Sequence, residues 1–545
     1  MTTILFKGGR IVDGSGKAAF KGHVLVEEDK ITAVFNENDV LPQADSTIDA
    51  SGCIVSPGFI DMHSHSDWLI VQPWGNDLLK YSLEQGITTI VGGNCGFSPA
   101  PVTNKSAILL NDFLARLLAE EPFEYKWHSM GGFFECMGKT PLVLNVAEQV
   151  GHVALRLSVA GERRGKMTDD EMTQCLKITK TALDDGACGL SFGLGYDPGM
   201  FCDTDEIEAF CRVAAETGKP VTVHMKALSK ISPVYPAYYL KPHNIRALKE
   251  ILAIGERTGV KLQLSHFIFV GRHSWRLANQ ALALVDRAVA KGVDVMIDAF
   301  PYTCGNTTVN VVFPYWFINS LPQGYASFWK RLRLKIELEI GFRLVGFIYK
   351  DFKVMDAVVR GLEYINGLAI TEIAKKWRTS PFKALLRLGR ESAGDALMLF
   401  STYSGDEKSE APMLKVLSHD RCLFETDAIL RQRGYPNPAG IGTFPKILGK
   451  YVRQQGVFSL ENAIMRMTSM SADRFGLKNR GRIAPGMAAD MVVFDPETVS
   501  DKTKGHLNIP AKPDGIRYVF VNGQKTVQDG SFIDDAKAAG RMLRT

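Results

Sequence analysis

Short apolar stretches and longer amphipathic stretches alternate along residues 57–475. Eight apolar stretches have the length and composition of buried strands, and they span residues 55–65, 88–98, 141–152, 187–195, 220–226, 260–268, 293–302 and 422–428. Two intervening stretches, 168–186 and 244–259, repeat apolar residues every three or four positions, which predicts helices with Asp169 and Asn244 as N-caps. Eight strands alternating with helices predict a (β/α)8 TIM barrel, an α/β fold whose reactive residues lie at the carboxyl ends of its strands.

The two ends of the chain differ from this alternating region. Residues 1–56 contain short strand-and-turn stretches, and residues 476–545 return to the same pattern. We therefore expect a barrel at 57–475 and a small β-sandwich beside it. The sandwich would be built from an N-terminal part at 1–56 and a C-terminal part at 476–545.

Side chains that bind metals follow several of the predicted strands. His63 and His65 end the first strand and share one face of it, because side chains alternate along a strand. The other candidates, in chain order, are Cys95, His224, His266 and Asp427. Taken alone, each is more often a hydrogen-bonded core residue or a small buried hydrophobe. Because all six are predicted at one face of one barrel, a divalent metal centre is the better interpretation.

Composition narrows the class of protein. A net charge of +5, with both signs mixed along the chain, favours neither a nucleic acid nor a membrane as a partner. The nine cysteines are odd in number and form no Cys-x-x-Cys pair, so free thiols in a reducing cytoplasm are expected. We recognise no signal peptide and no apolar run of membrane length, which also predicts a cytoplasmic protein.

Seven stretches of the chain form a recognisable set. They are PGFIDMHSHSD (57–67), GITTIVGGNCGFSPAPV (86–102), VGHVALR (150–156), GACGLSFGLGYDPG (186–199), DAFPYTCGNT (298–307), GTFPKILGKYVRQQG (442–456) and GRIAPGMAADMVVFDPETVSD (481–501). This set resembles the amidohydrolase superfamily and, more closely, its N-acyl-D-amino-acid deacylase (D-aminoacylase) family. The metal motifs are typical of the superfamily, and the Gly-Asn-Cys-Gly stretch is typical of this branch.

The resemblance implies how the six candidate ligands divide between two metal sites. His63, His65 and Asp427 resemble one site. Cys95, His224 and His266 resemble the other, with the Cys95 thiolate as the bridge. Many superfamily members instead use a carbamylated lysine from a middle strand, but residues 141–152 and 187–195 contain no lysine. Because thiolate and imidazole are preferred zinc ligands, one or two Zn²⁺ ions are expected.

The resemblance also implies a reaction, the hydrolysis of a C–N amide bond in a small N-acyl compound by metal-activated water. Asp427 would act first as general base and then as general acid, although a plainer interpretation makes it an inert ligand. Two alternatives stay open: a cyclic amide or imide hydrolase on the same barrel, and a non-catalytic metal-binding homologue. The second is disfavoured because all six ligand positions are occupied.

The chain departs from the family pattern where the substrate is expected to bind. The family has a lysine two residues after the sixth-strand histidine and an arginine shortly before the GTFP motif. This chain has Ile268 and Ala439 there. Both cations are associated with the free α-carboxylate of the substrate, which an apolar residue cannot bind. Lys226 and Tyr302 are the remaining candidates for substrate binding. We therefore expect weak activity on ordinary N-acyl-D-amino acids and better activity on neutral analogues.

A basic, aromatic-rich segment lies between the seventh and eighth strands. We place an insertion near residues 303–365, and its cations are Lys330, Arg331, Arg333, Lys335, Arg343, Lys350 and Lys353. The plainer interpretation is a helical cover with a solvated charged face. The functional interpretation, which the resemblance favours, is a lid that closes over the substrate. Glu337, Glu339 and Asp351 balance the charge, so a nucleic-acid surface is not expected.

Overall fold

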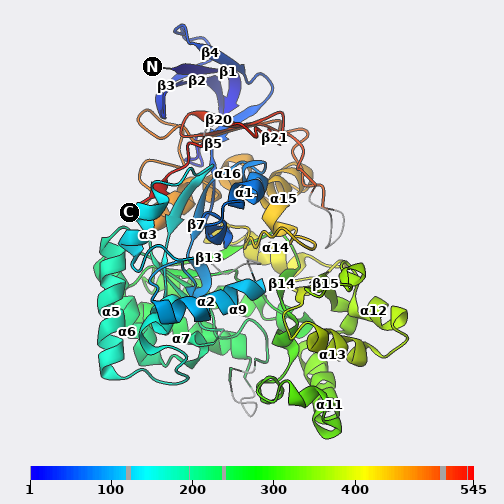
Figure 1. The fold of residues 1–545 in the computed structure, drawn as a ribbon. Helices are drawn as coiled ribbons and strands as arrows, with labels where there is room; N and C mark the ends of the chain where they lie inside the picture. The colour runs from blue at the N-terminus through cyan, green and yellow to red at the C-terminus, as the bar shows by residue number, and fades with distance from the viewer. Residues whose placement is uncertain are drawn as a thin grey trace.

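The structure is a computed structural model with an α/β fold of several sheets (Figure 1). It describes residues 2–117, 124–195, 197–232, 234–235, 241–503, 511–536 and 538–545. No helix among these residues combines the length and apolar character needed to cross a bilayer.

Both ends of the chain join one nine-stranded sheet, at the top of Figure 1. Its strands are β1 (Thr3–Ile11), β2 (Phe20–Glu27), β3 (Lys30–Asn36), β4 (Ser46–Asp49), β5 (Ile54–Pro57), β18 (Met491–Phe494), β19 (Ile516–Val521), β20 (Gln524–Gln528) and β21 (Ser531–Phe532). The ends meet where β5 pairs antiparallel with β18, with Val55 opposite Val493. Phe6 and Phe520, one from each end, pack edge to face in the core of this region. The pairing of the two termini therefore rests on long-range apolar contacts.

Two parallel sheets occupy the middle of the molecule. The first contains β6 (Phe59–Asp61), β7 (Ile87–Gly92), β8 (Asn145–Glu148) and β22 (Met542–Leu543). The second contains β9 (Val150–Gly151), β10 (Leu190–Gly193), β11 (Val221–His224), β12 (Leu262–Leu264), β13 (Val295–Ala299) and β17 (Cys422–Phe424). All their strand residues except those of β22 are buried, as in parallel sheets covered on both faces. Because only Gln149 separates β8 from β9, one stretch of chain contributes to both sheets.

Helices follow most of these strands. They are α1 (Gly75–Leu83), α2 (Asn104–Leu117), α3 (Met130–Met137), α4 (His152–Ala160), α5 (Asp169–Asp184), α6 (Thr204–Glu216), α7 (His243–Thr258), α8 (Arg272–Trp275), α9 (Ala278–Ala290), α14 (Ala411–Leu417), α15 (Ala439–Lys446), α16 (Leu460–Arg466) and α17 (Ser469–Phe475). Asp169 was the wrong N-cap for α5. Thr168 caps it, because its hydroxyl accepts from the Glu171 N–H while the Glu171 carboxylate accepts from the Thr168 N–H. The predicted N-cap of α7, Asn244, was also wrong, because α7 already begins at His243.

The segment between β13 and β17 packs around an apolar core of its own, at the lower right of Figure 1. Its antiparallel sheet contains β14 (Gly305–Thr308), β15 (Phe352–Asp356) and β16 (Leu397–Phe400). Its helices are α10 (Tyr315–Ile318), α11 (Phe328–Val345), α12 (Ile370–Lys376) and α13 (Pro381–Glu391). Because β16 is the central strand of this sheet, the packed unit extends well beyond the expected insertion at 303–365.

Candidate metal centre

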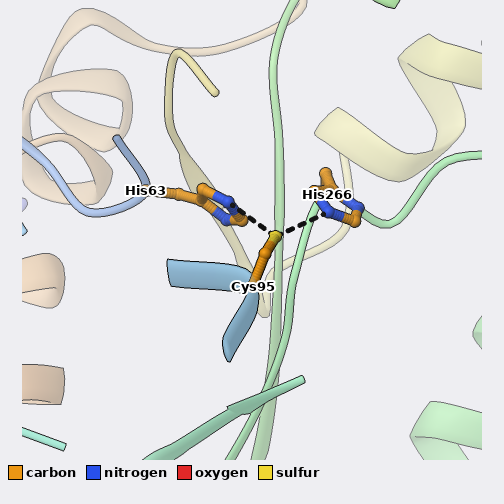
Figure 2. Close-up of side chains that lie close together, drawn as sticks. All are labelled: His63, Cys95 and His266. Carbon is orange, nitrogen blue, oxygen red and sulfur yellow. Dashed lines mark hydrogen bonds between the residues drawn. The ribbon is translucent and has the colours of Figure 1, made fainter. Parts of the chain in front are cut away.

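The Cys95 thiol lies at the centre of a cluster of imidazoles. Its Sγ atom is 3.5 Å from His63 Nε2, 3.4 Å from His266 Nε2 and 3.7 Å from His224 Nδ1. Figure 2 shows the His63 and His266 rings on opposite sides of the sulfur. Cys95 follows β7, His266 follows β12 and His224 is the last residue of β11. Parallel strands have brought side chains from distant parts of the sequence to one edge.

A second group shares His63 with the first. Asp427 Oδ1 lies 3.6 Å from His63 Nε2 and 3.5 Å from His65 Nε2. The Asp427 N–H donates to the His63 carbonyl over 3.0 Å, and a parallel bridge pairs Ser64 with Ala428. This backbone pairing holds the segment after β17 beside the segment after β6. All six candidate ligands therefore come together.

Three of these residues have strained backbones. Cys95, Asp427 and His266 have φ angles of 53°, 47° and 31°, in the left-handed region that ordinary residues rarely adopt. The glycines around Cys95 have a related role. A Cβ atom on Gly93 would lie 2.2 Å from the Gln149 carbonyl oxygen, and one on Gly96 would lie 2.7 Å from the Gly193 nitrogen. The Gly-Asn-Cys-Gly motif thus permits a tight turn that directs the thiol inwards.

The cluster favours the ionised forms of its acidic ligands. Burial opposes ionisation of the Cys95 thiol, but the charges of His63 and His266 outweigh burial and hold its pKa well below the ordinary value. Burial also opposes ionisation of Asp427, yet the hydrogen bond from His65 and the charges of the neighbouring imidazoles lower its pKa to about 2. A thiolate and a carboxylate are the forms that bind metal ions.

The spacing of the donor atoms fits zinc. Ligands about 2.0–2.3 Å from a tetrahedral zinc ion lie roughly 3.3–3.8 Å from one another. The distances from Cys95 to its three imidazoles and from Asp427 to its two fall within 3.4–3.7 Å. One contact departs from this spacing, because His224 Nδ1 and His266 Nε2 are 2.7 Å apart. Two ligands of one ion would have to lie farther apart than these atoms do.

Sequence analysis missed the carboxylates that support the candidate ligands. Asp298 Oδ1 lies 3.4 Å from His63 Nδ1 and accepts a hydrogen bond of 2.6 Å from the His266 N–H. This contact turns His63 Nε2 towards Cys95, as carboxylates do behind metal-binding histidines. Asp61 accepts hydrogen bonds from the backbone and hydroxyl of Thr426, which tie β6 to the segment after β17. The DAFPY motif contains Asp298, so its position at the end of a predicted strand is the sequence signal for this carboxylate.

Tyr403 was also missed. Burial raises the pKa of its phenol well above the ordinary value, and the charge of the Asp427 carboxylate raises it further. Tyr403 comes three positions after the end of β16, and its N–H donates to the Thr303 carbonyl, so it lies against the DAFPYTCG segment. No motif pointed to it, because its partners are distant in sequence.

The four predicted substrate residues separate into two places. Ile268, Tyr302 and Ala439 share one buried apolar cluster with Met355 and Leu399, between the parallel sheets and the β14–β16 sheet. Lys226 lies elsewhere, and its Nζ donates to the Cys202 carbonyl over 3.0 Å.

Tyr302 is tied to the C-terminal region by a further contact. Its hydroxyl donates to Asp501 over 3.1 Å, while Lys446 Nζ lies 3.8 Å from the centre of its ring. Ile268 and Ala439, the positions where the family has cations, therefore lie together in an apolar cluster, which Lys446 and Asp501 border at Tyr302.

Comparison with known proteins identifies the family. Residues 46–202 match the model of the Amidohydrolase family. The N-acyl-D-glutamate deacylase of Alcaligenes xylosoxydans xylosoxydans is 31% identical over 522 residues, which cover 95% of this chain and 92% of that protein. The chain belongs to the N-acyl-D-amino-acid deacylases of the amidohydrolase superfamily. The D-aminoacylase of the same organism is 29% identical over 99% of the chain and 97% of its own length.

Solved structures agree with this assignment. The N-acyl-D-glutamate deacylase of Bordetella bronchiseptica, solved with zinc and a phosphonate mimic of the tetrahedral intermediate, superposes with a TM-score of 0.79. It is 28% identical, and the match covers 99% of each chain. An L-hydantoinase from Arthrobacter aurescens superposes with a TM-score of 0.57 at 16% identity, covering all of both chains, which is a likeness of fold alone. The family expected from the sequence motifs is confirmed.

Proposed function

We propose that this deacylase-family protein is a zinc-dependent hydrolase that cleaves the C–N amide bond of a small N-acyl compound. The observation that carries the proposal is the convergence of six buried or nearly buried N, O and S donors, with Cys95 and Asp427 each 3.4–3.7 Å from their imidazole neighbours. His63, His65 and Asp427 would hold one ion, and Cys95, His224 and His266 the other. No feature of the site favours the cyclic amide alternative, since the hydantoinase likeness concerns the fold alone.

The proposed site lies in a barrel. We infer that the two parallel sheets close into one (β/α)8 barrel, because the segment Asn145–Gly151 joins them at one edge and the Ser64–Ala428 bridge joins them at the other. The nine-stranded sheet formed by both chain ends would then be the β-sandwich region beside the barrel. The lid role of the segment between β13 and β17 stays a prediction.

We propose a route by which the proton of the attacking water reaches the leaving nitrogen of the amide. A zinc ion held by these residues would supply an acidified water and would polarise the amide carbonyl. The Asp427 carboxylate, with its pKa lowered to about 2, is ionised at neutral pH and accepts the proton of the attacking water. It then delivers that proton to the leaving nitrogen. Asp298 contacts His63 Nδ1, on the side of the ring away from Cys95, and so fixes the orientation of the imidazole that both ligand groups share.

The apolar cluster around Ile268 and Ala439 supports a particular class of substrate. A free carboxylate placed there would lose its hydration without gaining a bidentate partner, which is costly. We therefore propose an N-acyl compound that is neutral or apolar at the position where N-acyl-D-amino acids carry the α-carboxylate. Lys226 is not part of this proposal, because its ammonium is engaged by the Cys202 carbonyl.

A matched substrate panel tests the proposal. N-acyl-D-amino acids are compared with their methyl esters, carboxamides and decarboxylated analogues, using zinc-loaded enzyme. We expect kcat/KM to be higher for the neutral compounds, and the Ile268→Lys and Ala439→Arg variants to shift the preference towards the free acids. Efficient turnover of the free acids alone by the unmodified enzyme would contradict the substrate class. No turnover of any compound by fully zinc-loaded enzyme would contradict the hydrolase assignment.

The free cysteines bear on the cellular compartment in which the protein acts. All nine cysteines are free in the structure. Because such thiols persist in reducing compartments, we propose that the protein acts in the cytoplasm on a small soluble molecule.

A further inference from the structure

Helix α11 has two apolar faces, of which the protein covers one. Leu334, Leu338, Phe342 and Val345 are buried in the core of the segment between β13 and β17. A second apolar row runs along the opposite side, because residues two positions apart lie about 200° apart around a helix. This outer row consists of Phe328, Trp329, Leu332, Ile336, Ile340 and Leu344. A helix that is apolar on two sides normally has a partner on each.

The outer row is strongly exposed. Trp329 is 75% exposed and Phe328 62%, while Ile336 and Ile340 are each 53% exposed. With Ile348, the outer row accounts for seven of the fourteen exposed large apolar side chains among the described residues. Isolated exposed apolar residues are ordinary, but a contiguous row marks an interaction surface.

Cations line a groove beside the outer row. A groove of about 680 Å³ between α11 and α13 is lined by Arg331, Lys335, Arg378, Lys383, Arg387 and Arg390, together with Phe328, Leu332 and Trp377. No carboxylate belongs to this lining. The two acids of α11 are engaged within the protein, since Glu337 accepts from Arg333 and Trp316 and Glu339 accepts from Tyr349. Beside the groove, Glu391 pairs with Arg387 and Arg390, which leaves Arg331, Lys335, Arg378 and Lys383 as its excess of positive charge.

The apolar row and the cationic groove together indicate which kind of partner would bind this surface. A second copy of the chain would bring one cationic surface against another, which is unfavourable. In Figure 1 α11 lies at the lower end of the molecule, far from the nine-stranded sheet, so this helix projects from the protein. A bilayer adapts to a projecting helix, and Trp, Phe, Leu and Ile flanked by Lys and Arg are the side chains of helices that lie in the interface of a membrane.

We propose that the outer row of α11 and the adjacent groove form a peripheral docking surface for a bilayer with anionic headgroups. The apolar side chains enter between the headgroups, and the groove cations bind lipid phosphates. This proposal changes the expectation, drawn from the net charge of the whole chain, that no membrane takes part. It is independent of the proposed reaction.

Sedimentation of the full-length protein with lipid vesicles tests the proposal. One set of vesicles is phosphatidylcholine alone, and the other contains added phosphatidylglycerol. We expect at least about tenfold stronger binding to the anionic set, weakening as salt is raised. Brominated lipid should quench the fluorescence of Trp329, and the Trp329→Leu variant should lose this component.

Two groups of variants separate the apolar and electrostatic contributions. The apolar variant combines Trp329→Ser, Ile336→Ser and Ile340→Ser, with Val40→Ser, at a 93% exposed site on the terminal sheet region, as its control. The charge variant combines Lys335→Glu, Arg378→Glu and Lys383→Glu, with Lys17→Glu as its control. Both test variants should lose at least about tenfold in vesicle binding while keeping their thermal midpoint, and the controls should bind normally.

Four results would overturn the proposal. The first is no preference for anionic vesicles, and the second is binding that the apolar variant leaves unchanged. The third is concentration-dependent self-association, without vesicle binding, that the apolar variant abolishes; the outer row would then join two copies of the chain. Binding of an acidic peptide in place of vesicles would likewise contradict it.

Discussion

Cys95 illustrates how single residues determine this site. It contacts the imidazoles of both ligand groups, and it does so from a left-handed backbone conformation that the glycines on either side allow. Such strain persists at functional sites when the surrounding structure enforces it. A residue that only filled space would have no physical reason to occupy this conformation.

The first prediction concerns the thiol. Cys95→Ala should lose zinc and nearly all hydrolysis, because alanine supplies neither charge nor a lone pair to the ions. Zinc content is measured by elemental analysis beside the thermal midpoint, and Cys53→Ala, in the terminal sheet region, is the matched control. Full metal content and activity in Cys95→Ala would show that this residue is only part of the core.

The second prediction concerns the proton acceptor. Asp427→Asn should lower kcat by about 10²–10⁴, the range for lost general acid–base catalysis. The rate must be measured on enzyme whose zinc content equals that of the unmodified protein, so that lost metal is not mistaken for lost proton transfer. Asp473→Asn, at an exposed ion pair with Arg482, should leave kcat unchanged. A near-normal kcat in Asp427→Asn would remove this carboxylate from the mechanism.

At the scale of elements, buried charges join α4 to α6. Glu206 on α6 accepts a hydrogen bond of 2.5 Å from Arg156 and lies 3.0 Å from His152 Nε2, and all three side chains are almost fully buried. Cys202 lies 3.3 Å from the same carboxylate. The combination of His, Cys and Glu resembles a set of metal ligands. The Arg156 guanidinium already neutralises the carboxylate, so this cluster is better understood as a structural ion pair.

The third prediction follows from the pKa of Glu206. Burial would raise it, but the hydrogen bond from His152 and the charge of Arg156 lower it to about 2, from 4.5. Because the folded pKa is depressed, the stabilisation is complete above about pH 4.5 and is lost as the pH falls towards 2. Its size is on the order of 3 kcal/mol.

Denaturant unfolding of Glu206→Gln at several pH values measures this effect. The variant should be less stable than the unmodified protein at neutral pH, and the difference in the free energy of unfolding should shrink below about pH 4.5. Glu208→Gln, which removes a carboxylate from two surface ion pairs, should change stability little at any pH. A difference that does not vary with pH would contradict the assigned ionisation.

At the scale of the whole molecule, the C-terminus completes one of the parallel sheets. Strand β22 pairs with β8, the Val146 N–H donates to the Arg541 carbonyl, and Lys219 Nζ donates to the Thr545 carbonyl. Asn145, at the start of β8, also accepts from the Arg541 N–H. Since β8 continues into β9, the last residues of the chain support the strand that links the two sheets.

The fourth prediction concerns this tail. Removal of residues 541–545 should lower the thermal midpoint by several degrees and shorten the half-life of activity on heating, because several hydrogen bonds worth about 1 kcal/mol each are lost. Initial activity at low temperature should persist, since no candidate ligand belongs to the tail. Lys219→Ala should also lower the midpoint, because it removes the bond to Thr545 together with the bonds to the Leu183 and Ala187 carbonyls. An unchanged midpoint after truncation would show that β22 contributes nothing to the stability of β8.

The sequence by itself determined the family, the alternating order of strands and helices and the set of candidate ligands. Those features are local. A strand has a recognisable composition, and a ligand follows its strand directly, as His63 follows β6 and His266 follows β12. The position of each candidate at the end of a predicted strand was therefore enough to place the six donors on one side of one fold.

Only the tertiary structure decided which groups surround those donors. Asp298 supports His63, the Asp427 charge raises the pKa of Tyr403, and the Lys226 ammonium is engaged by the Cys202 carbonyl. The same holds for the uncovered face of α11, because an apolar row in a sequence does not reveal whether another segment covers it. Each of these facts depends on contacts between residues distant in the chain, whose geometry no local pattern encodes.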